Sequence, residues 1–312
     1  MTDPNIVFFL SLTIILFGFL IKKANIIKEE GGKGIAKIII NITLPALIFD
    51  VIISLELVPQ LILLFFICIG FSVLVLSVGA LIFRNYKGSL KGVLLMTSIG
   101  YNIGLFAYPL IEGVWGEEGL QHIALFDFGN AFIVFGFCYI IAAIFSQKNQ
   151  SAEEKIDGKY IIKKLFTSLP LVSFIIAVIL NVLGLKLPFF LSELAAILSR
   201  ANMALTLLLL GIYLNFKFKK SEWMNVIKVI AIRYGLGLTF GTILFFLLPY
   251  SILYRTILLV ALILPVGMAV VPFVVEYEYS DKLKKLTGVI VNLTIVISFL
   301  LMWLITLIIG VS

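Results

Sequence analysis

Side chains that bind metal ions or act as bases are scarce in this sequence. His122 is the only histidine among 312 residues, and Cys68 and Cys138 are the only cysteines. A zinc site of the usual ligands and a nucleophile activated by histidine both lack the residues they need. The sequence also contains no Asp-rich motif and no ATP-binding motif. We therefore expect no metal site, no cofactor and no enzyme activity, and an integral membrane enzyme is only a distant alternative.

Charged residues are scarce as well. They make up 13% of the chain, whereas 62% of its residues are hydrophobic, a balance that soluble domains of this length do not reach. The net charge of +7 does not indicate nucleic-acid binding, because the basic residues stand in short clusters between apolar runs. The composition predicts an all-α integral membrane protein that crosses the cell membrane many times.

Ten apolar runs are long enough to span a bilayer, which takes roughly 20 residues per helix. The predicted helices cover residues 6–21, 35–55, 61–83, 90–111, 120–146, 165–183, 189–214, 224–248, 253–276 and 286–310. They form two groups of five, at 1–146 and 165–312, joined by a short polar linker at 147–164. Because five is odd, the second group enters the membrane in the opposite orientation, which predicts an inverted repeat.

The basic residues distinguish the two ends of these helices. Loops one, three, five, seven and nine hold clusters of lysine and arginine, whereas the even-numbered loops and both termini offer only Lys186 and Arg255. Cytoplasmic loops carry the excess of basic residues in membrane proteins. The odd-numbered loops and the linker at 147–164 are therefore predicted to be cytoplasmic, and both termini to be extracellular.

Two of the predicted helices contain residues that interrupt helices. In the fourth run these residues are Gly100, Asn102, Gly104 and Pro109. A shift of 163 residues places Gly104 and Pro109 on Gly267 and Pro272 in the ninth run, and Asn102 on Pro265. Irregular backbone at membrane depth is tolerated only where it is buried in protein or lines a watery cavity. Paired interruptions in two halves are typical of a transporter's binding site.

Other polar residues also fall inside the predicted spans. Asp127 and Asn130 are three residues apart and so share one helical face, and Asn292 lies roughly where the repeat shift places Asn130. A charge at this depth usually faces a bundle interior, which makes Asp127 a candidate for binding or for coupling to an ion; a packing hydrogen bond is the alternative. For Lys228 and Arg233 we expect a position near the cytoplasmic face, with their charged ends extended to the surface.

Three motifs, in this order and spacing, resemble the auxin efflux carrier family, which includes plant carriers and shorter prokaryotic members. They are Asn41-x-x-x-Pro45, the stretch from Asn102 to Pro109, and Leu264-Pro265-x-Gly267 followed by Val271-Pro272-Phe273-Val274. The resemblance spans the whole chain. It places the protein in the wider group that contains the bile acid sodium symporters.

The resemblance implies a particular architecture and activity. Its fold has two inverted five-helix repeats, whose broken helices four and nine cross near the middle of the membrane. Helices one, two, six and seven form a scaffold, and helices 3–5 and 8–10 form a mobile core that exports organic carboxylates by an elevator-like motion. Asn102 matches the substrate-contacting asparagine of the family, and Pro109, Pro265 and Pro272 match its crossing prolines.

The sequence departs from the plant carriers in ways that bear on the substrate. Asp127 stands where the plant carriers have a glutamine, which argues against auxin itself. We expect a carrier of small auxin-like or dicarboxylic acids, with a sodium-coupled symporter of the bile-acid type as the alternative. The expected partners are the carboxylate, a proton or sodium ion, the lipid bilayer and a second copy in a homodimer. The expected substrate-binding residues are Asn41, Tyr101, Asn102, Tyr108, Asp127, Asn130, Gly267 and Met268.

Overall fold

The structure is a computed structural model that describes residues 3–27, 29–146, 167–214 and 223–310. All regular secondary structure in these residues is helical, as the composition predicts. Seven helices in the described part of the chain are long and apolar enough to cross a membrane, and two shorter apolar helices accompany them. The predicted linker at 147–164 lies outside the described residues.

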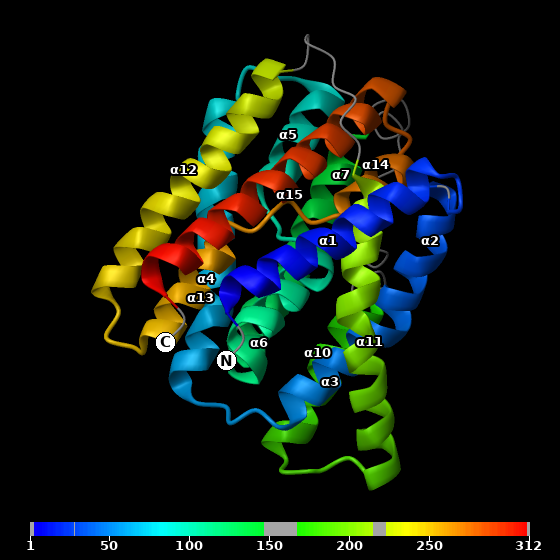
Figure 1. The fold of residues 1–312 in the computed structure, drawn as a ribbon. Helices are drawn as coiled ribbons and strands as arrows, with labels where there is room; N and C mark the ends of the chain where they lie inside the picture. Colours follow the sequence, from blue (N-terminus) through cyan, green and yellow to red (C-terminus); the bar gives the residue numbers. More distant parts are fainter. Residues whose placement is uncertain (1–2, 28, 147–166, 215–222, 311–312) are drawn as a thin grey trace.

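Figure 1 shows how the helices are arranged. In chain order they are α1 (Pro4–Lys23), α2 (Glu29–Ile38), η1 (Ile39–Thr43), α3 (Leu44–Ile53), α4 (Pro59–Ile82), α5 (Gly88–Ser98), η2 (Ile103–Ala107), α6 (Tyr108–Phe132), η3 (Ile133–Cys138), α7 (Tyr139–Ile144), α10 (Leu169–Val182), α11 (Phe189–Tyr213), α12 (Trp223–Leu247), α13 (Ile252–Leu262), α14 (Val270–Glu276) and α15 (Asp281–Ile309). The η elements are single turns of π-helix within longer helices.

Prolines set the starts of several helices. The first or second residue of α1, α3, α4, α6 and α10 is a proline. Proline suits this position because the first backbone N–H groups of a helix have no partner within it. The side chain of Asp3 adds a cap to α1, because it accepts a hydrogen bond from the backbone N–H of Asn5 at 2.9 Å.

One boundary differs from the prediction. The fourth and fifth predicted helices were separated by the whole of residues 112–119, whereas in the structure two helices meet within this stretch and together make up α6 (Tyr108–Phe132). A kink at Gly116 divides it, with φ 63° and ψ −152°. Glycine adopts this left-handed φ without a steric penalty. A single non-helical residue therefore separates the two helices, where the sequence predicted a loop of eight residues.

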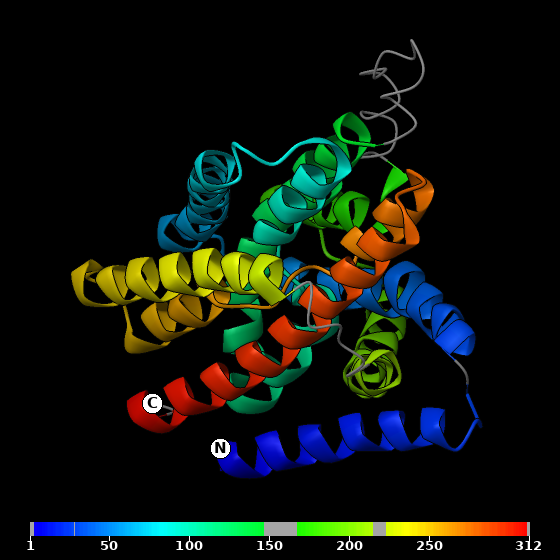
Figure 2. The same cartoon turned by 90° about the horizontal axis from the view of Figure 1, so that it is seen from above.

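The helices pack in two groups. One contains α1, α2, α3, α10 and α11, in which α11 contacts α1, α2 and α3, and α3 contacts α10. The other contains α4, α5, α12, α13, α14 and α15. α6 contacts members of both groups. Figure 2 shows α1 along one edge of the molecule.

Glycines bring the backbones of α1 and α11 close together. A Cβ atom on Gly18 would lie 2.1 Å from the carbonyl oxygen of Leu208, and one on Gly211 would lie 1.9 Å from that of Ile15. Neither position leaves room for a larger residue. Small residues at helix contacts are typical of membrane proteins, where packing replaces the hydrophobic effect between helices.

The connections between helices gather at two opposite ends (Figure 1). One end holds both termini and the α3–α4, α10–α11 and α12–α13 connections. The other end holds the α4–α5 and α14–α15 connections. Arg84, Lys87 and Lys282 lie in or beside the second set of connections. The helices thus run between an end with few basic residues and an end with more.

Candidate functional site

The two predicted interruptions meet in the structure. Between α5 and η2 the chain is not helical at residues 99–102, and between α13 and α14 it is not helical at residues 263–269. Tyr101 and Val266 form an antiparallel β-bridge, and the backbone N–H of Asn102 donates to the carbonyl oxygen of Pro265 at 2.9 Å. We call these two segments the crossing. Each segment supplies some of the hydrogen bonds that the other lost when its helix broke.

Side chains from neighbouring helices satisfy further backbone groups of the crossing. The Oδ1 atom of Asn130 accepts from the N–H of Tyr101 at 2.7 Å, and its Nδ2 atom donates to the carbonyl oxygen of Tyr101 at 3.0 Å. On the other segment, the Oγ1 atom of Thr294 accepts from the N–H of Val266 at 3.1 Å. The side chain that supports the second segment is thus that of Thr294, two residues after Asn292. The sequence gives no signal for Thr294, because threonine is common in helices of this kind.

Arg233 is also part of the crossing, which the sequence interpretation missed. Its side chain is 1% exposed and does not extend to the surface. The guanidinium donates to carbonyl oxygens from both segments of the crossing, at 2.7–3.0 Å. The prediction that Arg233 reaches the cytoplasmic face is therefore wrong. The signal was available, because Arg233 lies ten residues into α12, or about 15 Å along the helix.

Asn102 has the one feature of the crossing that calls for a ligand. Its side chain is 4% exposed, and its Nδ2 atom makes no hydrogen bond within the described residues. An unpaired buried donor costs about 1–3 kcal/mol. The backbone of Asn102 ends the extended segment just before η2, with φ −88° and ψ 73°. The amide nitrogen is thus a donor held in place and available to an acceptor.

Asp127 is linked to the crossing through Asn130. Its side chain is 7% exposed, and its Oδ1 atom accepts from Nδ2 of Asn130 at 3.0 Å. The Tyr108 hydroxyl lies near the Asp127 carboxylate, but it makes no hydrogen bond of normal length there. The structure therefore joins Asp127, Asn130 and Tyr101 in one connected set, with Asp127 and Asn130 on one helical face. Tyr108 adds a second buried donor beside them.

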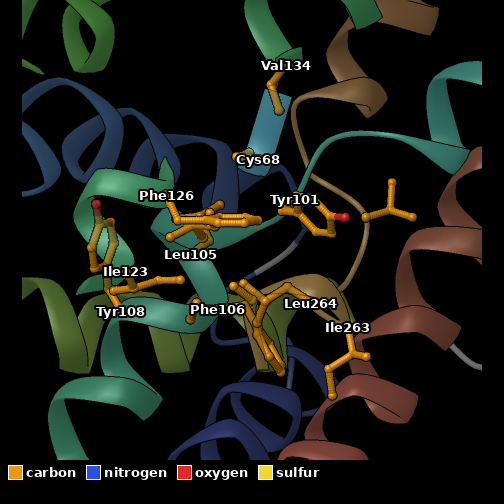
Figure 3. Packing of buried hydrophobic residues seen from close by; sticks show 14 of the residues in the cluster. Cys68, Tyr101, Leu105, Phe106, Tyr108, Ile123, Phe126, Val134, Ile263 and Leu264 are labelled. Atoms are coloured by element: carbon orange, nitrogen blue, oxygen red, sulfur yellow. The ribbon is translucent and has the colours of Figure 1, made fainter. Parts of the chain in front are cut away.

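Aromatic rings enclose this region. The rings of Tyr101 and Phe126 lie side by side, with centroids 5.6 Å apart, and Figure 3 shows them at the centre of the buried cluster. The guanidinium of Arg233 also stacks on the ring of Tyr101, with its Cζ atom 4.5 Å from the ring centroid. Tyr101 therefore contributes its backbone to the crossing and its ring to the packing around Arg233.

The remaining predicted residues lie at varying distances from the crossing. Gly267 follows the β-bridge, where an added Cβ atom would lie 3.2 Å from the carbonyl oxygen of Tyr101, and Met268 is half-buried beside it. Asn41 is not brought to this set, because its exposed side chain donates to the carbonyl oxygen of Lys37 on its own helix.

The three predicted crossing prolines occupy different places. Pro265 lies in the crossing itself and accepts the hydrogen bond from Asn102. Pro109 is buried at the start of α6. Pro272 is the third residue of α14 and is exposed.

A polar cleft of about 350 Å³ lies between α3, α6 and α11. Its charged lining residues are Asp50, Glu112, Glu117 and Arg200. Glu112 and Glu117 stand on either side of the kink at Gly116. The cleft thus lies where α6 meets α3 and α11 of the first group.

Comparisons with known proteins find relatives that are described as transporters. The chain is 28% identical over 290 residues to a protein described as an uncharacterized transporter from Methanocaldococcus jannaschii, covering 90% of this chain and 91% of that relative. It is 25% identical over 227 residues to an uncharacterized transporter from Methanothermobacter thermautotrophicus, covering 71% of this chain and 72% of that relative. The profile of the family described as membrane transport protein matches residues 7–306. The chain therefore belongs to the membrane transport protein family, the family of the auxin efflux carriers.

Proposed function

We propose that this protein is a secondary carrier of small organic anions. The observation that carries the proposal is the unpaired Nδ2 atom of Asn102, buried where two broken helices cross. A carboxylate accepts hydrogen bonds readily, and charge-assisted hydrogen bonds are stronger than neutral ones. The Tyr108 hydroxyl provides a second unpaired donor. Membership of a transporter family, rather than any enzyme family, supports the same class of function.

We propose that the helices form two inverted five-helix repeats related through the crossing. Two segments related by a twofold axis run antiparallel where they meet, as Tyr101 and Val266 do in their β-bridge. A neighbouring helix also supports each segment, because Asn130 accepts a hydrogen bond from the N–H of Tyr101 and Thr294 accepts one from the N–H of Val266. Similar helix breaks in both halves are typical of carriers that bind their substrate at mid-membrane.

An elevator-like motion of one group of helices against the other is the mechanism we propose. The group of α1, α2, α3, α10 and α11 would be the scaffold, and the group that contains the crossing would move. The cleft between α3, α6 and α11 supports this division, since it lies where α6 meets the proposed scaffold. Closely packed scaffold helices, such as α1 and α11, suit a part that stays fixed.

For the orientation, we propose that both termini face the outside of the cell membrane. The two sets of connections at opposite ends, and the basic residues at one of them, support this assignment. Starting from a variant without Cys68 and Cys138, we expect Lys186→Cys to react with a membrane-impermeant maleimide in intact cells. Asn85→Cys should react only after the cells are opened. If Asn85→Cys reacts in intact cells and Lys186→Cys does not, the protein has the opposite orientation.

Carboxylates are expected to stabilise the protein purified in detergent against heat. A ligand that binds only the folded state adds about 2.7 kcal/mol of stability at a hundred times its Kd. We would measure melting temperatures with a panel of mono- and dicarboxylates, and with the corresponding uncharged amides as controls. The expected result is a saturable rise for at least one carboxylate and none for its amide.

The Asn102→Ala variant provides the matched control for this panel. It should lose the rise caused by the carboxylate, whereas Asn292→Ala, which removes a half-buried amide on α15, should keep it. Stabilisation by amines in place of carboxylates, or an equal rise in Asn102→Ala, would contradict the proposed site.

A further inference from the structure

Five hydrogen bonds connect one guanidinium to both segments of the crossing. On the first segment and the end of α5, Arg233 donates to the carbonyl oxygens of Ser98, at 3.0 Å, and Gly100, at 2.7 Å. On the second segment it donates to Leu264, at 3.0 and 2.9 Å, and to Pro265, at 3.0 Å. Four carbonyl oxygens therefore converge on one positive charge: one from the end of α5, one from the first segment and two from the second segment. We call these four oxygens the carbonyl cage.

The charge of Arg233 is balanced by these carbonyl groups and not by a carboxylate. In the described part of the chain the only ion pair joins Lys284 and Asp281, at the surface. A buried ion without a partner charge is costly, so the carbonyl oxygens and the ring of Tyr101 must replace its water. Rings of backbone carbonyls serve the same purpose for dissociable cations in channels and carriers.

The carbonyl cage exists because the helices break at this place. The last carbonyl groups of a helix have no partner within it, and the breaks after Ser98 and Leu262 leave such groups in the middle of the molecule. Without a cation, oxygens from two segments would face one another with like partial charges. The crossing therefore needs a positive charge to hold its two segments together.

The sequence of α12 is adapted to bring that charge into place. Gly237 lies one turn after Arg233, and a Cβ atom there would lie 2.3 Å from the carbonyl oxygen of Leu262. The absent side chain lets α12 approach α13 closely, just before the second segment of the crossing. The guanidinium consequently lies where a free ion would otherwise have to bind.

We propose that Arg233 is a built-in cation of the crossing, which occupies the carbonyl cage in place of a free cation and makes binding and transport independent of sodium. Its effect on the substrate rests on the proposed function; the cage does not. The oxygen of Pro265 accepts from both Arg233 and the N–H of Asn102. A fixed positive charge thus stands next to the amide proposed to bind the carboxylate. Arg233 is a positioning residue, because it acts through the crossing.

The test compares melting temperatures of the purified protein in sodium, potassium, choline and guanidinium chloride at equal ionic strength. We expect the wild type to melt at the same temperature in sodium, potassium and choline. Arg233→Ala should melt lower in choline, by about 5–10 °C. Low millimolar guanidinium, or sodium, should restore part of that loss in a saturable way, since either ion fits the vacated cage.

Arg255→Ala is the matched control. Arg255 also donates to a backbone carbonyl oxygen, that of Phe245 at 3.0 Å, and stacks on the ring of Phe245, but it lies outside the crossing. Its removal should produce no dependence on the cation. If the wild type itself melts higher in sodium than in choline, or Arg233→Ala does not respond to any cation, the proposal is wrong.

Two further variants decide the matter if Arg233→Ala does not fold. Arg233→Lys keeps the charge and should remain independent of sodium, whereas Arg233→Gln keeps hydrogen-bond donors without the charge and should become dependent on an added cation. Equal behaviour of the two would assign Arg233 to hydrogen bonding alone and overturn the proposal. These readouts need no substrate, so a failure of the carboxylate panel would not affect them.

Discussion

Asn102→Ala is expected to lower the ratio of Vmax to KM for carboxylate uptake by roughly 10- to 100-fold. Hydrogen bonds to charged groups contribute about 1.5–3 kcal/mol, and each 1.4 kcal/mol is a factor of ten in this ratio. The melting temperature should stay close to that of the wild type. The Nδ2 atom of Asn102 makes no hydrogen bond within the described residues, so its removal leaves no buried partner unsatisfied.

The measurement is uptake into proteoliposomes, with protein content and melting temperature recorded for each variant. Asn130→Ala is an informative contrast, because Asn130 makes two hydrogen bonds to the backbone of Tyr101 and one to Asp127. It should lose stability as well as uptake. The half-buried amide of Asn292 again supplies the neutral control. Wild-type uptake kinetics in Asn102→Ala would remove Asn102 from the binding site.

The helix breaks could be predicted from sequence because their cause is local. Gly100, Asn102 and Pro109 each disfavour a regular helix by their own covalent structure, and the apolar length around them already requires burial. The same local logic located Pro265 and Gly267 in the second break. The contact between the breaks was expected from the resemblance to the family, because periodicity alone relates no distant residues.

The cluster around Arg233 could not be found by the same reasoning. Its partners are backbone carbonyl oxygens, which every residue has, so no pattern of side chains marks them. The depth of Arg233 in α12 excluded a surface position, but it did not say what the guanidinium would meet. Thr294 was missed for a related reason, since threonine is common in helices of this kind and does not mark a backbone that needs support.

Gly116 illustrates a third limit. A run of eight residues, 112–119, contains three glycines and three glutamates and so predicts a loop. In the structure one glycine with positive φ separates two helices, and helical turns continue on both sides. The polar side chains there serve the cleft instead, with Glu112 and Glu117 in its lining. Composition indicated the turn correctly but not how little backbone it requires.

Asp127→Asn is expected to keep substrate binding and to abolish the pH dependence of net flux. A bound carboxylate and an ionised Asp127 would place two negative charges in one water-poor site, so binding of the anion should bring a proton to Asp127. With one linked proton, the apparent affinity of the wild type weakens by up to about tenfold for each unit of rising pH. An asparagine mimics the protonated form at every pH, and its oxygen can still accept from Asn130.

The other titratable groups near Asp127 must be separated from it. They are Tyr108 at the start of α6 and Cys68 on α4. Tyr108→Phe and Cys68→Ala should both keep the pH profile of the wild type, although Tyr108→Phe loses affinity if its hydroxyl binds the substrate. The flux is measured between roughly pH 5.5 and 8, where simple carboxylates stay ionised, so that titration of the substrate does not enter.

The alternative role for Asp127 makes the opposite prediction. A permanent anion that binds sodium would couple transport to that ion, and Asp127→Asn would then lose both transport and its sodium dependence while pH had little effect in either protein. Three measurements on the same proteoliposomes distinguish the accounts: flux against pH, flux in sodium against choline, and carboxylate affinity. A proton role requires retained affinity, a flat pH profile and indifference to sodium in Asp127→Asn. If that variant instead follows the wild-type pH profile, Asp127 only packs against Asn130, and the coupling proton must be carried elsewhere.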